Sequence, residues 1–268
     1  MTTLIIMKRI ALVSICVFTI SFLPPFVRAD QTNIAEDDAS QEAYNGGFDN
    51  GKNGGSGFGE WKMTSEGNDE HRHSGFFVAT TDNNKDLNGI AKNGKAWGLY
   101  ANGTGFEQAV AFRAFSQPLA AGDSFSFMME NGKIEKKFET DDPATGSIGL
   151  TLRTSNATDS PADYNKDAIF EFGFYEGKDN YQIYDGSGAD KTDSGVPMTD
   201  SGVIVTITIT GADTYDLEIQ TATDKKLTKL PGRKLASAGA IASLAIFNRD
   251  GEKTDAFFNS LQVAREAK

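Results

Sequence analysis

Runs in which apolar and polar residues alternate recur along most of the chain. In one of them, Val205, Ile207 and Ile209 alternate with Thr206 and Thr208. Because successive side chains of a β-strand point to opposite faces, this pattern predicts a strand with one buried and one solvated face. Gly, Asn and Asp separate the runs, and no amphipathic helical stretch of normal length interrupts them. The pattern therefore predicts an all-β chain built from antiparallel sheets.

The alternating runs predict many short strands joined by turns. Their ranges are 76–80, 97–101, 109–115, 124–130, 147–154, 169–175, 181–185, 203–210, 215–221, 240–247 and 257–263. This number of strands at this spacing is typical of a β-sandwich. The apolar face of the runs predicts a shared core that contains Phe125, Phe127, Leu150, Leu152, Phe172, Phe174, Val205 and Ile207.

The first 29 residues predict a signal peptide rather than part of the fold. Lys8 and Arg9 precede an apolar run over 10–18, and a small residue, Ala29, stands where a signal peptidase would cleave. Cys16 follows Ile15, whereas a lipoprotein signal needs a small residue before the Cys. We expect cleavage after Ala29, no lipid anchor, and a secreted protein, either extracellular or periplasmic.

The mature chain is expected to form one domain. Residues 30–75 are rich in Gly, Asn and Asp with little periodicity, which predicts turns and loops. We expect this segment to pack on the sandwich through Phe48 and Trp61, and residues 76–268 to form the rest of the domain.

Charge and motif content exclude several classes of function. The formal net charge is −11, which argues against nucleic acid or an anionic membrane as partner. A single Cys excludes a disulfide framework and a Cys-based zinc site. The chain carries no nucleophile elbow, no phosphate-binding Gly-Lys-Ser/Thr loop and no His-Glu-x-x-His motif. Esterase, kinase, NTPase and metalloprotease functions are therefore not expected.

One predicted hairpin brings polar and aromatic groups onto a common face. If residues 177–180 form its loop, Tyr175 pairs with Gln182 and Gly173 pairs with Tyr184. The face opposite the core then carries Glu171, Tyr175, Gln182 and Tyr184 around the bare Gly173, which leaves a shallow slot. If Glu130 and Arg153 lie on neighbouring strands of the same sheet, the slot becomes a groove lined by carboxylates, a guanidinium, an amide and phenols.

Several short runs of the chain resemble a known family. They are Ala96-Trp97-Gly98-Leu99-Tyr100-Ala101-Asn102, Gly122-Asp123-Ser124-Phe125-Ser126-Phe127, Asn180-Tyr181-Gln182-Ile183-Tyr184-Asp185-Gly186, Thr210-Gly211-Ala212-Asp213-Thr214-Tyr215 and Phe257-Phe258-Asn259-Ser260-Leu261. From about residue 37 to 263 the chain resembles an exported bacterial domain of the concanavalin A-like lectin/glucanase type. The resemblance implies a jelly-roll sandwich whose concave sheet, in many relatives, holds a carbohydrate.

The chain departs from the catalytic patterns of that superfamily. Laminarinase and agarase relatives carry Glu-x-Asp-x-x-Glu on one strand, whereas Glu171 and Glu176 fall on opposite faces here. Alginate-lyase relatives place Arg, Gln or Asn, His and Tyr on the concave sheet. The set Arg153, Gln182, Tyr184 and Tyr175 is an incomplete version of that pattern, with no His.

Three functions remain open, with a polysaccharide or oligosaccharide as the expected partner in the first two. The first is carbohydrate binding, for which the candidate ligand-binding residues are Tyr175, Gln182, Tyr184, Arg153, Trp97 and Tyr100. The second is a glycoside hydrolase or polysaccharide lyase that uses the same groove, with Glu171, Glu130 and Tyr184 as candidate catalytic residues. The third is a structural or matrix-associated exported protein. For Trp97 the alternative is a buried core residue, because large aromatic side chains are usually buried.

The expected cofactor is none, or a structural calcium ion. Asp82, Asn84 and Asp86 place oxygen ligands at alternate positions, as in a calcium loop, although Lys85 and the lack of a bidentate Glu weaken the pattern. An ordinary solvated turn is the alternative. His71 and His73 have the spacing to share a metal on a strand, but the sequence offers no third ligand.

Overall fold

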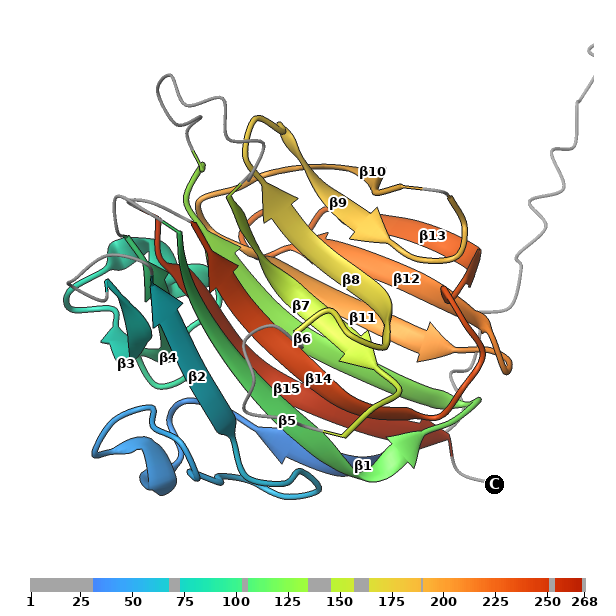
Figure 1. Ribbon diagram of the computed structural model, residues 1–268, viewed down its shortest axis with the longest axis horizontal. Helices are drawn as coiled ribbons and strands as arrows, with labels where there is room; N and C mark the ends of the chain where they lie inside the picture. The colour runs from blue at the N-terminus through green and yellow to red at the C-terminus, as the bar shows by residue number, and fades with distance from the viewer. Residues whose placement is uncertain are drawn as a thin grey trace, which may run out of the picture.

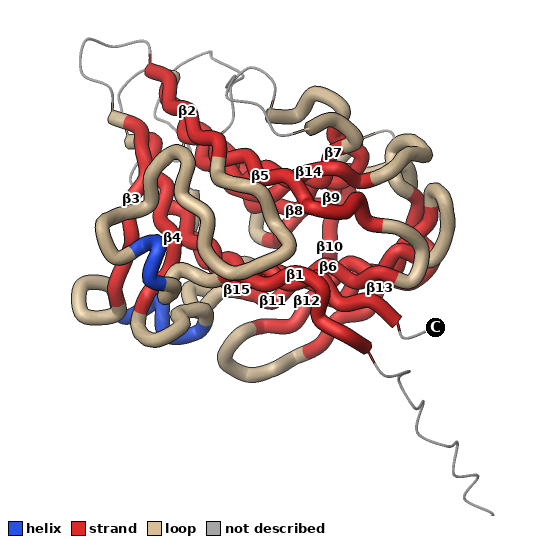
Figure 2. The backbone as a smooth tube through the Cα atoms, turned by 90° about the horizontal axis from the view of Figure 1, so that it is seen from below, coloured by secondary structure: helices blue, strands red, loops and turns tan. Residues whose placement is uncertain are grey.

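The chain forms two antiparallel β-sheets packed face to face, as the computed structural model shows (Figures 1 and 2). The structure describes residues 31–67, 73–102, 106–134, 146–156, 164–188, 190–250 and 254–266. The predicted signal peptide, residues 1–29, lies outside the described residues. The predicted fold class, an all-β antiparallel sandwich, is confirmed.

The first sheet, called the seven-stranded sheet, carries the predicted hairpin. Its strand order is β10 (Thr192–Pro197), β9 (Asn180–Tyr184), β8 (Ala168–Tyr175), β7 (Ser147–Arg153), β14 (Ile241–Arg249), β5 (Glu107–Leu119) and β2 (Lys62–Gly67). Strand β14, from the end of the chain, lies between β7 and β5. The order of the strands therefore does not follow the order of the sequence.

The second sheet is called the eight-stranded sheet. Its order is β13 (Leu227–Lys234), β12 (Thr214–Thr221), β11 (Val203–Ile209), β6 (Asp123–Asn131), β15 (Ala256–Glu266), β4 (Lys95–Ala101) and β3 (Ser74–Thr80), and β1 (Gln31–Asp37) also pairs with β15. Two short 3-10 helices, η1 (Glu42–Tyr44) and η2 (Lys85–Gly89), complete the described elements. Figure 2 shows the two sheets as separate layers.

All of the strands predicted from the alternating runs are present, with ends that differ by a few residues. The four strands that the sequence did not predict are β1, β2, β10 and β13. Strands β2, β10 and β13 are edge strands, and among the described strands β1 pairs with β15, with one further isolated bridge from Glu36 to Ser56. An edge strand needs no continuous apolar face and tolerates Pro and Gly. Accordingly, β10 contains Gly195 and Pro197, and β13 contains Pro231 and Gly232.

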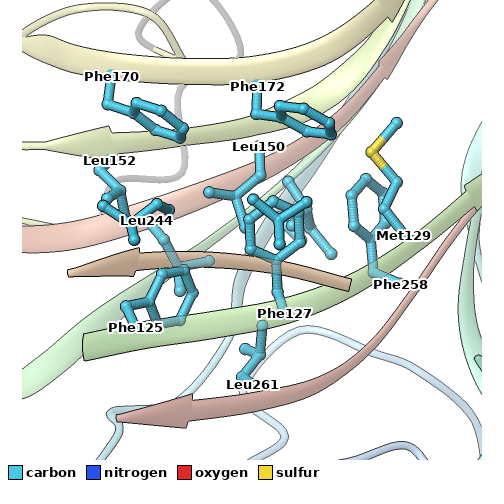
Figure 3. Packing of buried hydrophobic residues seen from close by; sticks show 14 of the residues in the cluster. Phe125, Phe127, Met129, Leu150, Leu152, Phe170, Phe172, Leu244, Phe258 and Leu261 are labelled. Atoms are coloured by element: carbon cyan, nitrogen blue, oxygen red, sulfur yellow. The ribbon is translucent and has the colours of Figure 1, made fainter. Parts of the chain in front are cut away.

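The core lies between the two sheets, as Figure 3 shows. Phe125 and Phe127 of β6 point toward Leu150 of β7 and Phe172 of β8, and the ring centroids of Phe127 and Phe172 are 6.2 Å apart in an edge-to-face arrangement. Every residue of the predicted core is fully buried. The period of two along each strand was therefore sufficient to assign the core face.

Residues 31–67 are anchored on the sandwich by a buried polar and aromatic cluster. The Asp37 carboxylate accepts hydrogen bonds from the Arg113 guanidinium and from the Tyr44 hydroxyl. The Trp61 ring nitrogen donates to the Tyr44 oxygen at 3.0 Å. Trp61 also packs edge-on against Trp97, with ring centroids 5.5 Å apart. This segment thus closes one end of the core and places Trp97 inside it.

Candidate functional site

The outer face of the seven-stranded sheet gathers the residues of the predicted hairpin. The β8–β9 register pairs Glu171 with Tyr184 and Gly173 with Gln182. The predicted pairs, Tyr175 with Gln182 and Gly173 with Tyr184, are wrong by two residues. An even shift leaves every side chain on the same face. The predicted faces are therefore correct, while the neighbours across the strands differ.

Strand pairing arranges the outer face in cross-strand rows. One row runs Tyr184, Glu171, Thr151, Ala245, Phe112 and Lys62. The next row runs Gln182, Gly173, Gly149, Phe247, Val110 and Thr64. The row beyond it includes Tyr175, Ser147, Arg249, Gln108 and Glu66. Polar and aromatic groups thus concentrate at the β9–β8–β7 end, and β14 and β5 are apolar in the first two rows and polar, with Arg249 and Gln108, in the third.

Glu171 is the central ionisable group of this face. It is buried, and the hydroxyl of Tyr175, four residues along β8, donates a hydrogen bond to its carboxylate. Burial raises the pKa of Glu171 to about 7, and the positive charges of Lys191 and Arg249 oppose this rise. A substantial fraction of Glu171 is therefore protonated at neutral pH, so that its carboxyl group can either accept or donate a proton.

Two cations and a second phenol surround Glu171. The Lys191 ammonium nitrogen lies 4.6 Å from the centroid of the Tyr175 ring. Burial raises the pKa of Tyr164, as does the nearby charge of Glu171, whereas Arg249 lowers it by its charge and by a hydrogen bond to the phenol. Tyr164, Lys191 and Arg249 carry no signal in the sequence pattern, because each lies in a loop or beyond the end of a predicted strand.

Tyr164 covers part of the apolar region of the face. Its ring packs against Phe247 with centroids 4.7 Å apart. The Thr151 hydroxyl, which neighbours Glu171 across β7 and β8, donates to the Tyr164 carbonyl oxygen at 3.2 Å. Residue Tyr164, shortly before β8, is thereby held against the sheet at the edge of the Glu171 site.

Exposure separates the predicted ligand-binding residues into two groups. Tyr184 is 37% exposed, whereas Gln182 is buried and donates to the carbonyl oxygen of Asn180 at 2.9 Å. Arg153 is buried as well, and its guanidinium donates to the carbonyl oxygens of Lys166 and Asn156 at 3.2 and 3.3 Å. The Arg153 guanidinium therefore binds backbone carbonyl oxygens of the segments next to the strand. Of the predicted set, Tyr184 is the side chain best placed to meet a ligand.

Three other predicted residues lie away from this face. Trp97 is fully buried in the core, which is the alternative considered for it. Tyr100 lies half-buried on β4 of the eight-stranded sheet, with its ring 6.2 Å from that of Phe77. Glu130 lies at the end of β6, also in the eight-stranded sheet. The expectation that Glu130 shares a groove with Glu171 is wrong, because strand order places the two carboxylates on different sheets.

The predicted calcium loop is not a preformed metal site. Asp82 is exposed, and the Asn84 side chain caps η2 by accepting a hydrogen bond from the Asp86 backbone N–H at 3.0 Å. Within the described residues, no group of three or more His, Cys, Asp and Glu side chains stands ready to hold an ion. His73 is exposed, and His71 lies outside the described residues.

Among the helices that the structure describes, none combines the length and the apolar character needed to cross a membrane.

Comparisons with known proteins find distant similarity among solved structures. No protein-family profile matches the sequence, and no curated protein matches it. One similar structure is a legume lectin-like domain from Entamoeba histolytica, at 11% identity and a TM-score of 0.42, covering 72% of this chain and 90% of that one.

Two further similar structures are a lectin and a lyase. Winged bean acidic lectin complexed with methyl-alpha-D-galactose gives 9% identity and a TM-score of 0.41, covering 78% of this chain and 100% of that one. An endo-beta-1,4-glucuronan lyase from the fungus Trichoderma reesei gives 9% identity and a TM-score of 0.40, covering 76% of this chain and 94% of that one. At these identities and TM-scores, neither activity extends to this chain.

Proposed function

We propose that this protein binds a carbohydrate on the outer face of the seven-stranded sheet. The observation that carries the proposal is the exposed ring of Tyr184, which stands beside the buried carboxyl of Glu171 in one cross-strand row. An exposed aromatic ring can stack on the apolar face of a sugar, and a few fixed polar groups beside it can select its hydroxyls. A carbohydrate partner is compatible with the predicted export of the chain.

Two glycines lie beside these groups, one on β7 and one on β8. Gly149 and Gly173 are paired across β7 and β8, so that the row between Glu171 and Tyr175 has no side chain at either position. A side chain added at either glycine would meet backbone atoms of the neighbouring strand at 2.5 Å. Both glycines are buried, and the Phe247 ring lies 3.0 Å from where a Gly149 Cβ atom would stand, so this ring covers the sheet at Gly149.

The charges near Glu171 favour an acidic sugar. The chain as a whole is strongly acidic, yet the two charged groups that act on Glu171 are the cations Lys191 and Arg249. A cation in a partly buried site attracts a carboxylate ligand. We therefore expect a uronate-containing polysaccharide to bind better than a neutral one.

The test compares two exposed apolar side chains. Tyr184 and Leu227 are the exposed large hydrophobic residues of the part of the chain that the structure describes, and Leu227 lies on β13 of the eight-stranded sheet. In affinity electrophoresis against neutral and uronate polysaccharides, Tyr184→Ala should weaken retention about tenfold or more, by loss of a stacking interaction of roughly 1 to 3 kcal/mol. Leu227→Ala should retain the glycan as the wild type does. Equal retention by both variants would contradict the proposal.

A second candidate function is cleavage of the bound polysaccharide. The observation in its favour is the pKa of Glu171, about 7, combined with the hydrogen bond from the Tyr175 hydroxyl. A group with a pKa near neutrality is suited to general acid–base catalysis. Hydrolysis by two carboxylates would need a partner within roughly 5 to 10 Å, and Glu130, on the other sheet, does not supply one. The neighbouring phenols and cations fit β-elimination from a uronate better.

Glu171→Gln separates binding from cleavage. The substitution keeps the shape of the side chain and removes the titratable group. If the protein is a lyase, the rate at which unsaturated, ultraviolet-absorbing products form should fall about 100-fold or more, while retention survives. If wild-type protein that retains a glycan releases neither unsaturated products nor new reducing ends, the cleavage candidate fails and binding alone remains.

A further inference from the structure

A cavity on the eight-stranded sheet is lined almost entirely by oxygen-bearing side chains. It has a volume of about 200 Å³, and the residues that matter are Asn84, Asp86, Glu130, Asp200, Thr254 and Asp255. They come from four separate parts of the chain: helix η2 and its cap, the end of β6, the turn before β11, and the segment before β15. Among the described residues that line it, there is no Lys or Arg.

Glu130 is the buried group at this cavity. The residue is 3% exposed, and its Oε2 atom is buried without a hydrogen-bond partner in the described structure. An unpaired carboxylate in such a place is costly unless a cation compensates it.

A second carboxylate at the cavity shows the same feature. The Oδ1 atom of Asp255 is buried without a hydrogen-bond partner among the described residues, although the Asp255 side chain also forms a hydrogen bond with Asn102. Asp86 and Asp200 are exposed, so that their side chains can rotate. The cavity thus combines the buried Glu130 with the half-buried Asp255 and two exposed carboxylates.

We propose that this cavity binds a divalent cation of the size of Ca²⁺, with Glu130 at its base and Asp86, Asp200 and Asp255 around it. Carboxylate, amide and hydroxyl oxygens are the ligands that Ca²⁺ takes, in flexible arrangements of six to eight. Mg²⁺ demands a stricter octahedral set and gives up its water less readily. Because no three carboxylates of the described residues already converge on one point, the exposed Asp86 and Asp200 turn inward when the ion binds.

This site differs from the calcium loop that the sequence predicts. Asn84 and Asp86 belong to both, but Asp82 does not line the cavity, and the other carboxylates come from positions 130, 200 and 255. An ion held there would link η2, β6, the turn before β11 and the start of β15. Its effect would be on the stability of the eight-stranded sheet, independently of the glycan proposed for the other sheet.

The experiment titrates EDTA-treated protein with Ca²⁺ and with Mg²⁺, using isothermal calorimetry and thermal unfolding. We expect one Ca²⁺ per chain, a higher Tm with Ca²⁺, and weaker binding of Mg²⁺. Glu130→Gln and Asp200→Asn should each weaken Ca²⁺ binding at least tenfold. Asp82→Asn, the matched control, removes an exposed carboxylate from the same loop and should bind Ca²⁺ as the wild type does.

The outcomes decide the proposal in either direction. Absence of heat and of any Tm shift at millimolar Ca²⁺ overturns it, as does wild-type affinity in both Glu130→Gln and Asp200→Asn. If Asp82→Asn alone lost Ca²⁺ binding, the ion would belong to the loop that contains Asp82, and the proposal would likewise be overturned. Glu130→Gln removes a buried repulsive charge, so the variant should fold, and an unchanged far-ultraviolet spectrum would confirm that its lost affinity is local.

Discussion

At the level of single residues, one buried ion pair anchors the N-terminal segment on the sandwich. Asp37 and Arg113 form an ion pair whose side chains are both fully buried. The Arg113 guanidinium also donates to the carbonyl oxygen of Gly54 at 3.0 Å and stacks 4.8 Å from the Trp61 ring centroid. A buried charge that loses its partner is strongly destabilising, whereas an exposed pair contributes little.

The first prediction follows from this contrast. Asp37→Ala leaves a buried guanidinium unpaired and should lower the free energy of unfolding by about 3 to 5 kcal/mol. Glu60→Ala breaks the exposed ion pair with Lys62, in which Lys62 Nζ lies 2.5 Å from Glu60 Oε1. This substitution should lower the free energy of unfolding by less than about 1 kcal/mol. Urea unfolding of both variants measures the difference. Equal losses would mean that the burial of the Asp37 pair has no energetic consequence.

The second prediction concerns the pH dependence of stability. Burial raises the pKa of Glu171 from 4.5 to about 7, so the folded protein holds this proton more tightly than the unfolded chain. The protonated Glu171 therefore contributes to stability at low pH. As the pH rises through 7, the folded state must ionise a buried carboxyl that the unfolded chain has already ionised, and the stability contributed by the bound proton is lost. Glu171→Gln cannot ionise. Its stability relative to the wild type should therefore rise between pH 5 and pH 8, by on the order of 3 kcal/mol. A difference that stays constant over this range in urea unfolding would contradict the shift.

At the scale of elements, the pairing of β1 depends on backbone contacts that only glycine allows. Glu36 of β1 exchanges backbone hydrogen bonds of 2.8 and 2.9 Å with Ser56. The adjacent Gly55 has φ +66°, and a Cβ atom there would lie 1.9 Å from the Glu36 carbonyl oxygen. Strand β1 can therefore lie against residues 55–56 only because residue 55 has no side chain.

The third prediction compares two glycines of similar backbone conformation. Gly177, in the β8–β9 turn, has φ +72°, and a Cβ atom added there would meet no other residue's atoms within 4 Å. Gly177→Ala should cost only the conformational strain, about 1 to 2 kcal/mol. Gly55→Ala adds a backbone clash and should cost clearly more, with increased hydrogen exchange in β1. Similar losses in denaturant unfolding would show that β1 does not depend on this contact.

At the scale of the whole molecule, the two sheets share one core and should unfold together. Phe172 of the seven-stranded sheet packs on Phe127 of the eight-stranded sheet, and strands distant in sequence alternate within each sheet. Neither sheet has a separate apolar core of comparable size among the described residues. Cooperative unfolding follows from this arrangement.

The fourth prediction tests this shared core. Phe172→Ala should lower the free energy of unfolding by about 3 to 5 kcal/mol and shift the transition as a single step. Circular dichroism and tryptophan fluorescence should report the same midpoint, because Trp61 and Trp97 are buried in the same core cluster. Two separate transitions, or a neutral substitution, would contradict a single core.

The candidate site shows how far local pattern extends. The alternation along β8 and β9 placed Glu171, Tyr175, Gln182 and Tyr184 on the outer face, since side-chain direction in a strand depends only on parity. It did not give their exposure: Tyr184 is exposed, whereas the other three are buried. The burial of a side chain is a tertiary property, because it depends on neighbouring segments whose positions cannot be read from the strand itself.

The fold class, the core face and most of the strands could be predicted from the sequence, because each follows from a period of two within a short window. Which strands are neighbours could be learned only from the folded chain. It placed Glu130 on the eight-stranded sheet, away from Glu171, and brought Arg249 from the end of β14 close to Glu171. The physical reason is that strand order is set by long-range hydrogen bonding and by the packing of whole sheets, and neither leaves a signal in the local alternation of residues.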